Sequence, residues 1–170
     1  GAEIDQEMNS GATPLFIASQ QDKIRVVEAL LEGGANVNKT RYNGASPLYI
    51  ASFKGHEMVV RTLLLKGGAE INESENRGWT PLFAAVHHGY ETISSALLEA
   101  GADFDKADHR GRTPLYEASL MGRVMAVEML LKRGADVMKA TNEGHRPRSV
   151  AKVERIMVML DHAILKRARR

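Results

Sequence analysis

The chain has 170 residues, of which 44% are hydrophobic and 26% carry a charge, and it contains no cysteine. This composition is typical of a folded domain, and it excludes disulfides and thiolate metal sites. No apolar run approaches the roughly 18 residues of a membrane-spanning helix, and the first residues do not form a signal peptide. We therefore expect an intracellular protein, cytoplasmic or nuclear, without a transmembrane segment.

Charge is distributed unevenly along the chain. Residues 144–170 hold eight Lys/Arg and two Asp/Glu, a balance of +6, whereas residues 1–143 have a balance of −4. Because the larger part is mildly acidic, we do not expect it to bind nucleic acid. Binding of nucleic acid or of an anionic membrane through the basic C-terminal helix is the alternative to the function that the repeats described below indicate.

Four segments of the chain share one pattern at a spacing of 33 or 34 residues. Each begins with Gly-x-Thr/Ser-Pro-Leu, at Gly11, Gly44, Gly78 and Gly111, and each later contains Leu-Leu and then Gly-Ala. A fifth, degraded copy begins at Gly144. Self-similarity at this period indicates a stack of units, none of which buries its apolar face alone.

Each full copy predicts two helices. A hydroxyl residue is placed to cap the first helix, and the proline that follows fits the first helical position. A turn residue separates the two helices, and a glycine ends the second helix in a left-handed cap. The caps are Thr13, Ser46, Thr80 and Thr113; the turns lie at Asp22, Gly55, Gly89 and Gly122; the second helices end at Gly34, Gly68, Gly101 and Gly134.

In chain order, the pattern predicts a partial repeat at 1–10, repeats at 11–43, 44–77, 78–110 and 111–143, and a degenerate capping repeat at 144–170. The repeat at 44–77 has one extra residue, for which we expect a lengthened or bulged second helix. In the capping repeat Arg146 replaces the capping Thr and Arg148 replaces the Leu. An apolar side of the closing helix should pack on the preceding repeat; it comprises Val153, Ile156, Met157, Leu160 and Ile164. We interpret its basic end, Lys166–Arg170, as a solvated helix terminus, with nuclear import or docking of acidic groups as the alternative.

These motifs resemble the ankyrin repeat family over nearly the whole chain. The resemblance implies an all-α fold, an α-solenoid of stacked helix–turn–helix repeats with β-hairpin fingers. It also implies a protein–protein interaction module, a segment of a scaffold, adaptor or regulatory protein that binds its partner in a concave groove. Phe16, Tyr49, Phe83 and Tyr116 stand where the family most often has His, and we expect them to be framework residues.

In this family the groove is formed by the finger tips and by the exposed face of each first helix. By position, the partner-binding residues are Tyr42, Phe53, Lys54, Arg77, Trp79, His87, His88, His109, Arg110, Arg112, Leu120 and Met121. Trp79 is the only Trp and occupies a variable position, which we expect to lie outside the core; aromatic and Arg residues dominate interface hot spots. An apolar floor with a basic rim suits a partner segment that carries acidic residues. The alternative is that these side chains only cover neighbouring repeats. Alanine at Trp79 and Arg112 should weaken partner binding with little change in Tm, and normal binding by both variants would show that the groove assignment is wrong.

No motif in the sequence supports catalysis. A phosphate loop and a Gly-x-Ser-x-Gly elbow are absent, so we predict neither an enzyme nor a cofactor. His87, His88 and His109 lack an accompanying carboxylate, so we expect no metal site. Asn38 and Asn72 stand where some members of the resembled family are hydroxylated, and nothing else in the sequence supports that modification.

We expect the protein to be a monomer.

Overall fold

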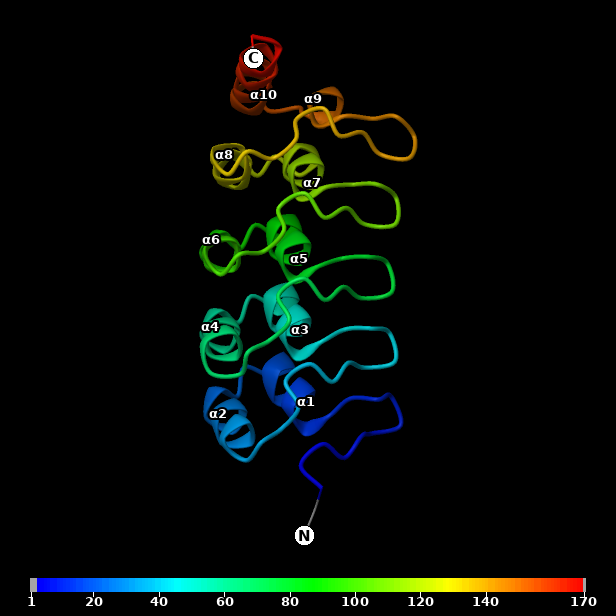
Figure 1. The fold of residues 1–170 in the computed structure, drawn as a ribbon, viewed down its shortest axis with the longest axis vertical. Coiled ribbons are helices and arrows are strands. Elements are labelled where there is room, and N and C mark those ends of the chain that lie inside the picture. Colours follow the sequence, from blue (N-terminus) through cyan, green and yellow to red (C-terminus); the bar gives the residue numbers. More distant parts are fainter. Residues whose placement is uncertain (1–2, 170) are drawn as a thin grey trace.

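The computed structural model describes residues 3–169, which form ten α-helices and no β-strand. Figure 1 shows the helices stacked in pairs along one long axis, with the connecting loops projecting to one side. The pairs are α1 (Pro14–Gln20) with α2 (Ile24–Glu32), α3 (Pro47–Lys54) with α4 (Glu57–Leu65), α5 (Pro81–His88) with α6 (Glu91–Glu99), α7 (Pro114–Leu120) with α8 (Val124–Lys132), and α9 (Pro147–Val150) with α10 (Glu154–Ala168). First helices contact first helices of the next pair, and second helices contact second helices, so the chain is a helical solenoid.

The first helices begin at the predicted hydroxyl caps. The Thr13 side chain accepts a hydrogen bond from the backbone N–H of Phe16 at 3.1 Å, and the same bond recurs at the same distance in the next three repeats. Proline follows each cap, where its missing N–H leaves no helical bond unmade. The turn predicted at Asp22 is also confirmed, because Asp22 has a left-handed φ of +57°.

The second helices of the first four pairs end before the predicted glycines, all of which have positive φ. At Gly134 φ is +90°, and an added Cβ would meet nothing within 4 Å. Glycine is therefore required at this position for its backbone conformation and not for space.

One continuous apolar seam runs between the two rows of helices. It is built from the same positions in successive repeats, and its fully buried members include Leu15, Leu48, Leu82, Leu115, Leu63, Leu97 and Leu130. A second, smaller cluster lies on the loop side and contains Phe16, Tyr49 and Phe83. Together with Tyr116, these rings are at most 7% exposed, so they are framework residues as predicted.

The loops that precede the first helices contain tight turns at residues 8–12, 41–45, 75–79, 108–112 and 141–145, here called finger loops one to five. They hold no strand, so the prediction of β-hairpin fingers is wrong for residues 3–169. In finger loop three, for example, the N–H of Glu75 donates to the carbonyl of Trp79 at 3.1 Å, and the N–H of Gly78 donates to the carbonyl of Glu75 at 2.7 Å. These two bonds close a turn but do not extend into a ladder.

Hydrogen bonds also run along the stack, from one finger loop to the next. The N–H of Asn76 donates to the carbonyl of Asn43 at 2.9 Å, and the N–H of Asn142 donates to that of Arg110 at 3.0 Å. Finger loops two and four make the corresponding bonds to their predecessors. The loops are therefore held in register by the repeat spacing.

The extra residue of the repeat at 44–77 lies in the turn after α4. Helix α4 has nine residues, as α2, α6 and α8 do, so the predicted lengthened or bulged helix is wrong. The N–H of Ala69 donates to the carbonyl of Leu63, six residues earlier, whereas that of Ala102 donates to Leu97, five residues earlier. The turn accommodates the insertion because it is widened by one residue.

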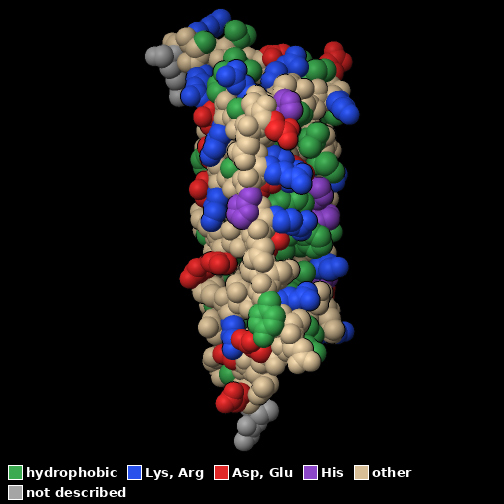
Figure 2. Space-filling view, turned by 90° about the vertical axis from the view of Figure 1, so that its right-hand side faces the viewer, with side chains coloured by type: hydrophobic (Ala, Val, Ile, Leu, Met, Phe, Trp, Pro, Cys, Tyr) green, Lys and Arg blue, Asp and Glu red, His purple; other side chains and the backbone are tan. Residues whose placement is uncertain are grey.

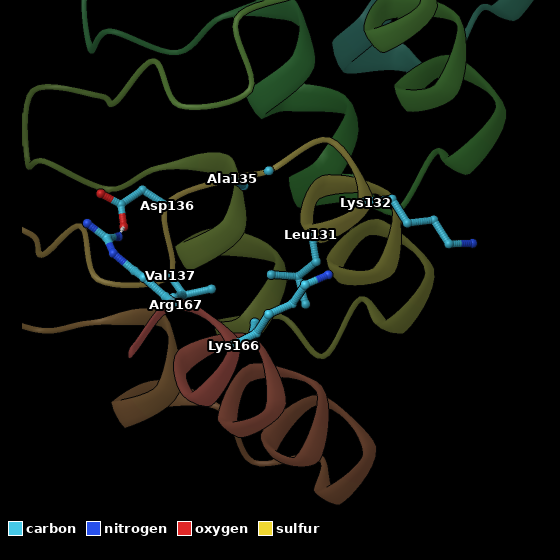
Figure 3. Close-up of a pocket in the computed structure, with 9 residues that line it drawn as sticks. Leu131, Lys132, Ala135, Asp136, Val137, Lys166 and Arg167 are labelled. Atoms are coloured by element: carbon cyan, nitrogen blue, oxygen red, sulfur yellow. Dashed lines mark hydrogen bonds and ion pairs between the residues drawn. The ribbon is translucent and has the colours of Figure 1, made fainter. Parts of the chain in front are cut away.

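The two helices of the last pair differ in length from their counterparts in the earlier pairs. Helix α9 has four residues, and α10 has fifteen. The glycine that ends each earlier second helix is replaced by Arg167, and α10 continues past it. Arg167 also forms an ion pair with Asp136 in the loop after α8 (Figure 3).

Helix α10 packs on α8 through the side that the sequence predicts. Ile156 and Leu160 are fully buried, whereas Val153, at the edge, is 36% exposed. Arg170 of the predicted basic terminus, and residues 1–2 of the predicted partial repeat, lie outside the described residues. None of the helices in residues 3–169 has both the length and the apolarity needed to cross a bilayer.

Candidate functional site

The predicted partner-binding residues lie on the side of the stack formed by the finger loops and the first helices. The finger loops carry Tyr42, Arg77, Trp79, His109, Arg110 and Arg112, and the ends of α3, α5 and α7 carry Phe53, Lys54, His87, His88, Leu120 and the adjoining Met121. We call these twelve residues the groove face. Figure 2 views the molecule from the finger side and shows basic and His side chains gathered over its middle, with hydrophobic side chains among them.

Trp79 is packed rather than free. It is only 8% exposed, and its ring centroid lies 4.9 Å from that of Phe83 and 5.0 Å from that of His87. The guanidinium carbons of Arg77 and Arg112 lie 4.8 and 5.7 Å from its ring centroid. The expectation that Trp79 lies outside the core is therefore wrong: its ring extends the loop-side apolar cluster beneath two arginines.

Because Trp79 is buried, an alanine variant at this position reports folding stability as well as partner binding. Removing a buried aromatic ring costs about 3 kcal/mol or more of folding stability. Arg112 is held in the same layer, with its side chain only 18% exposed. In place of the expected small change, alanine at either position should therefore lower Tm, and these variants are poor probes of binding.

Buried carboxylates bind Arg77 of finger loop three and Arg112 of finger loop four from the interior side. The side chains of Glu75 and Asp108 are only 5% and 1% exposed. Glu75 accepts a bond from Nε of Arg77 at 3.3 Å, and Asp108 pairs with Nη2 of Arg112 at 2.7 Å. Each carboxylate also accepts backbone N–H bonds within its own loop, from Arg77 and Arg110 respectively, both at 2.9 Å. The carboxylates therefore lie deeper than the guanidinium groups that they bind.

Glu117, on α7, is a third buried carboxylate, with a side chain that is 1% exposed. One of its oxygens accepts a bond from Nη1 of Arg112 at 3.2 Å, and the other lies 2.6 Å from Nδ1 of His87 on α5. The cluster thus links two successive repeats. Sequence reasoning missed Glu117, although a signal was present: the earlier repeats have Ile17, Ile50 and Ala84 at this position.

The three predicted histidines have different surroundings. His88 packs among rings, with its centroid 4.5 Å from that of Phe53 and 5.7 Å from that of Tyr90. Burial, and then the neighbouring His87 and cations, lower the pKa of His88. His87 pairs with Glu117, and His109 lies exposed on finger loop four. Within residues 3–169 no three His, Asp or Glu side chains converge as metal ligands would.

The remaining groove-face residues are more open. Tyr42 is 70% exposed, and Lys54 lies with its Nζ 5.9 Å from the ring centroid of the half-buried Phe53. Leu120 and Met121 are 38% and 40% exposed. The end of α7 is open because α9 stops at Val150, three residues before the counterpart of Leu120.

A pocket of about 610 Å³ lies between α7 and finger loop five. Its lining comprises His109, Arg110, Arg112, Tyr116, Leu120, Thr141, Asn142 and Glu143. Four of these residues were predicted from the sequence to bind a partner. The structure therefore brings together groove-face residues of finger loop four and of the end of α7, namely His109, Arg110, Arg112 and Leu120.

A second pocket, of about 530 Å³, lies between the loop after α8 and the end of α10 (Figure 3). Lys132, Lys166 and Arg167 are among its lining residues. Several cations of the last repeat are already paired: Arg148 with Asp161 at 2.7 Å, Arg155 with Glu128 at 3.7 Å, and Arg167 with Asp136. The basic C-terminal end is thus partly neutralised by the protein itself.

Asn38 and Asn72 connect consecutive repeats. The side-chain carbonyl of Asn38 accepts a bond from the N–H of Glu70 at 2.8 Å, and that of Asn72 accepts one from Asp103 at 2.9 Å. These bonds give both residues a structural role in the stack.

One family model, described as ankyrin repeats (3 copies), matches residues 1–75 and again residues 63–141. No curated protein sequence matches the chain significantly. The matched region, the repeated hydroxyl caps and the paired helices agree with the resemblance seen in the sequence. The chain belongs to the ankyrin repeat family, whose members generally act as protein–protein interaction modules.

Proposed function

We propose that the chain is the interaction module of a scaffold, adaptor or regulatory protein, and that its groove face binds an acidic segment of a partner. The supporting observation is the layering of charge in finger loops three and four. Glu75 and Asp108 are buried, whereas the Arg77 side chain is 66% exposed and Arg110 is exposed. An approaching partner therefore meets guanidinium groups before it meets carboxylates.

The arginines are also held in position before a partner arrives. Arg77 and Arg112 lie over the Trp79 ring and are bonded to buried carboxylates. A planar guanidinium binds carboxylates through two parallel hydrogen bonds, and one that is already oriented loses less conformational freedom on binding. This arrangement favours carboxylate-bearing partners over apolar or basic ones.

The other candidate functions have less support. Binding of nucleic acid or an anionic membrane through α10 would use Arg148, Arg155 and Arg167, whose acidic partners are themselves 31–52% exposed, so an approaching anion also meets carboxylates. Catalysis requires a nucleophile, a base and an orienting group around a reacting atom. The groove-face residues Arg77, Arg112 and His87 are instead bonded to the buried carboxylates Glu75, Asp108 and Glu117.

Selection of random peptides displayed on phage, with the intact chain as bait, tests the proposal. We expect the selected peptides to be enriched in Asp and Glu. The charge-reversal variant Lys54→Glu/Arg110→Glu should bind them at least tenfold more weakly, since both residues are exposed on the groove face.

The matched control is Arg25→Glu/Lys132→Glu, which reverses two exposed charges on the second helices α2 and α8. It should bind the peptides as the unmodified chain does. Selection of neutral or basic peptides, or equal weakening by the control, would overturn the proposal.

A further inference from the structure

We propose that the pocket between α7 and finger loop five is the anchor of the groove face, taking an apolar side chain and a neighbouring carboxylate from the partner. This inference rests on the proposed function and adds the place and the orientation of the bound segment. It commits to one occupant, an acidic peptide segment with an apolar residue beside its acidic residue.

The apolar half of the pocket is open because the last repeat is short. At the ends of α3 and α5 the equivalent side chains contact the next repeat: Phe53 lies against His88, and His87 against Glu117. Leu120 is the next member of this series. Its neighbour would come from a longer α9, but α9 ends at Val150, and Leu120 remains 38% exposed. A partner side chain can take the place that the missing helical turn leaves.

The charged half of the pocket is provided by finger loop four. Asp108 fixes the backbone N–H of Arg110, and the Arg110 side chain has no ion-pair partner in residues 3–169. Arg112 reaches the same wall while bonded to Asp108 and Glu117, so both nearby carboxylates are already used. Arg110 is thus the cation available to a new carboxylate.

The rim opposite finger loop four carries a negative charge, which orients the bound segment. Glu143 lies on finger loop five with its side chain 81% exposed, and its Oε2 lies 3.5 Å from Nδ1 of His145. A partner carboxylate is repelled from this rim and attracted to finger loop four, where Arg110 and His109 lie. The volume of about 610 Å³ falls within the range of roughly 300–1,000 Å³ typical of ligand pockets, so it has room for the side chains of a short segment.

Synthetic octapeptides test this placement. Each carries one Asp-Glu pair and one Leu, at varied spacing, in a Gly/Ser background; a second set replaces Asp-Glu with Asn-Gln. We expect the best acidic peptide to bind the intact chain at least tenfold more tightly than its Asn-Gln partner. The variants Leu120→Ser and Arg110→Ala should each weaken it about tenfold. Arg110 is exposed and Leu120 lies at the open end of α7, so both variants should still fold, which their Tm checks.

A photoreactive analogue of the Leu residue locates the bound peptide. Cross-links to residues 116–121 or 141–143, identified by mass spectrometry, would support the anchor. If acidic peptides bind but Leu120→Ser and Arg110→Ala have no effect, and cross-links fall on α1 or α3, the anchor is wrong while the proposed function stands. If no acidic peptide binds more tightly than its Asn-Gln partner, both are overturned.

Discussion

Glu117 on α7 and His87 on α5 are joined by a 2.6 Å contact between Oε1 and Nδ1, in a layer where the preceding repeats make apolar contacts. One repeat earlier the same two positions hold Ala84 and Phe53, which pack in the loop-side apolar cluster. The same backbone thus accommodates a polar pair or an apolar pair. A polar pair at this depth is costly when only one of its members remains.

Replacement of Glu117 by Ala should therefore destabilise the protein. We expect the free energy of unfolding to fall by about 2–4 kcal/mol, because His87 and one Arg112 bond lose their buried partner and a cavity forms. The double variant Glu117→Ala/His87→Phe reproduces the Ala84–Phe53 pair and should recover at least half of the loss. Urea denaturation measures both values. A double variant no more stable than the single one would show that the apolar pair cannot substitute at this layer.

Gly134→Ala should destabilise the protein through the backbone alone. The φ of +90° disfavours any residue with a Cβ, and the space around the position is open. We expect a loss of about 1–2 kcal/mol by denaturation, and a smaller loss for Gly134→Asn, because Asn tolerates left-handed conformations. A loss in Gly134→Asn that equals or exceeds the loss in Gly134→Ala would contradict a backbone cause.

Ser52→Ala should be neutral or slightly stabilising. The buried Ser52 hydroxyl has no hydrogen-bond partner in residues 3–169, whereas Ser19 and Ser119, at the same position of other repeats, donate to carbonyls at 2.7 Å. Removing an unsatisfied buried hydroxyl relieves a desolvation cost. Ser19→Ala is the matched control and should cost about 0.5–1 kcal/mol. The prediction fails if Ser52→Ala lowers Tm as much as Ser19→Ala does.

Local rules predicted the framework well because each depends on a few adjacent residues. Each hydroxyl residue followed by proline in this chain caps a helix, so Thr13 and its counterparts were identified correctly. Asp22 was placed in a turn for the same kind of reason. The extra residue was wrongly assigned to the second helix, because a run of leucines extends helical periodicity although the chain turns after Leu65.

The candidate site was harder to predict because its members meet across repeats. The burial of Trp79 depends on side chains from finger loop three, α5 and finger loop four together. The repeat pattern marks that position as variable, and a variable position is not always an exposed one. His87, one of the two partners of Glu117, is thirty residues away, so only the tertiary structure identifies it.

Tyr49 should give the protein a stability that is lost at alkaline pH. Burial, followed by the charge of Glu75, raises the pKa of Tyr49 to about 12, against an ordinary value of 10. The folded state therefore holds the phenolic proton more tightly than the unfolded state does. The resulting stabilisation is complete below pH 10 and disappears as the pH rises to about 12. Phe16 and Phe83 occupy the same position in other repeats, so Tyr49→Phe should fold normally.

Thermal melts of the two proteins between pH 9 and pH 12 isolate this contribution, since all other titrating groups are shared. We expect the Tm of the unmodified chain to fall more steeply than that of Tyr49→Phe over the upper two pH units. The absorbance of tyrosinate should rise further near pH 12 in the unmodified chain than in Tyr49→Phe. Parallel Tm curves would mean that the Tyr49 proton is not held more tightly in the folded state, and the assigned effect of its burial would then be wrong.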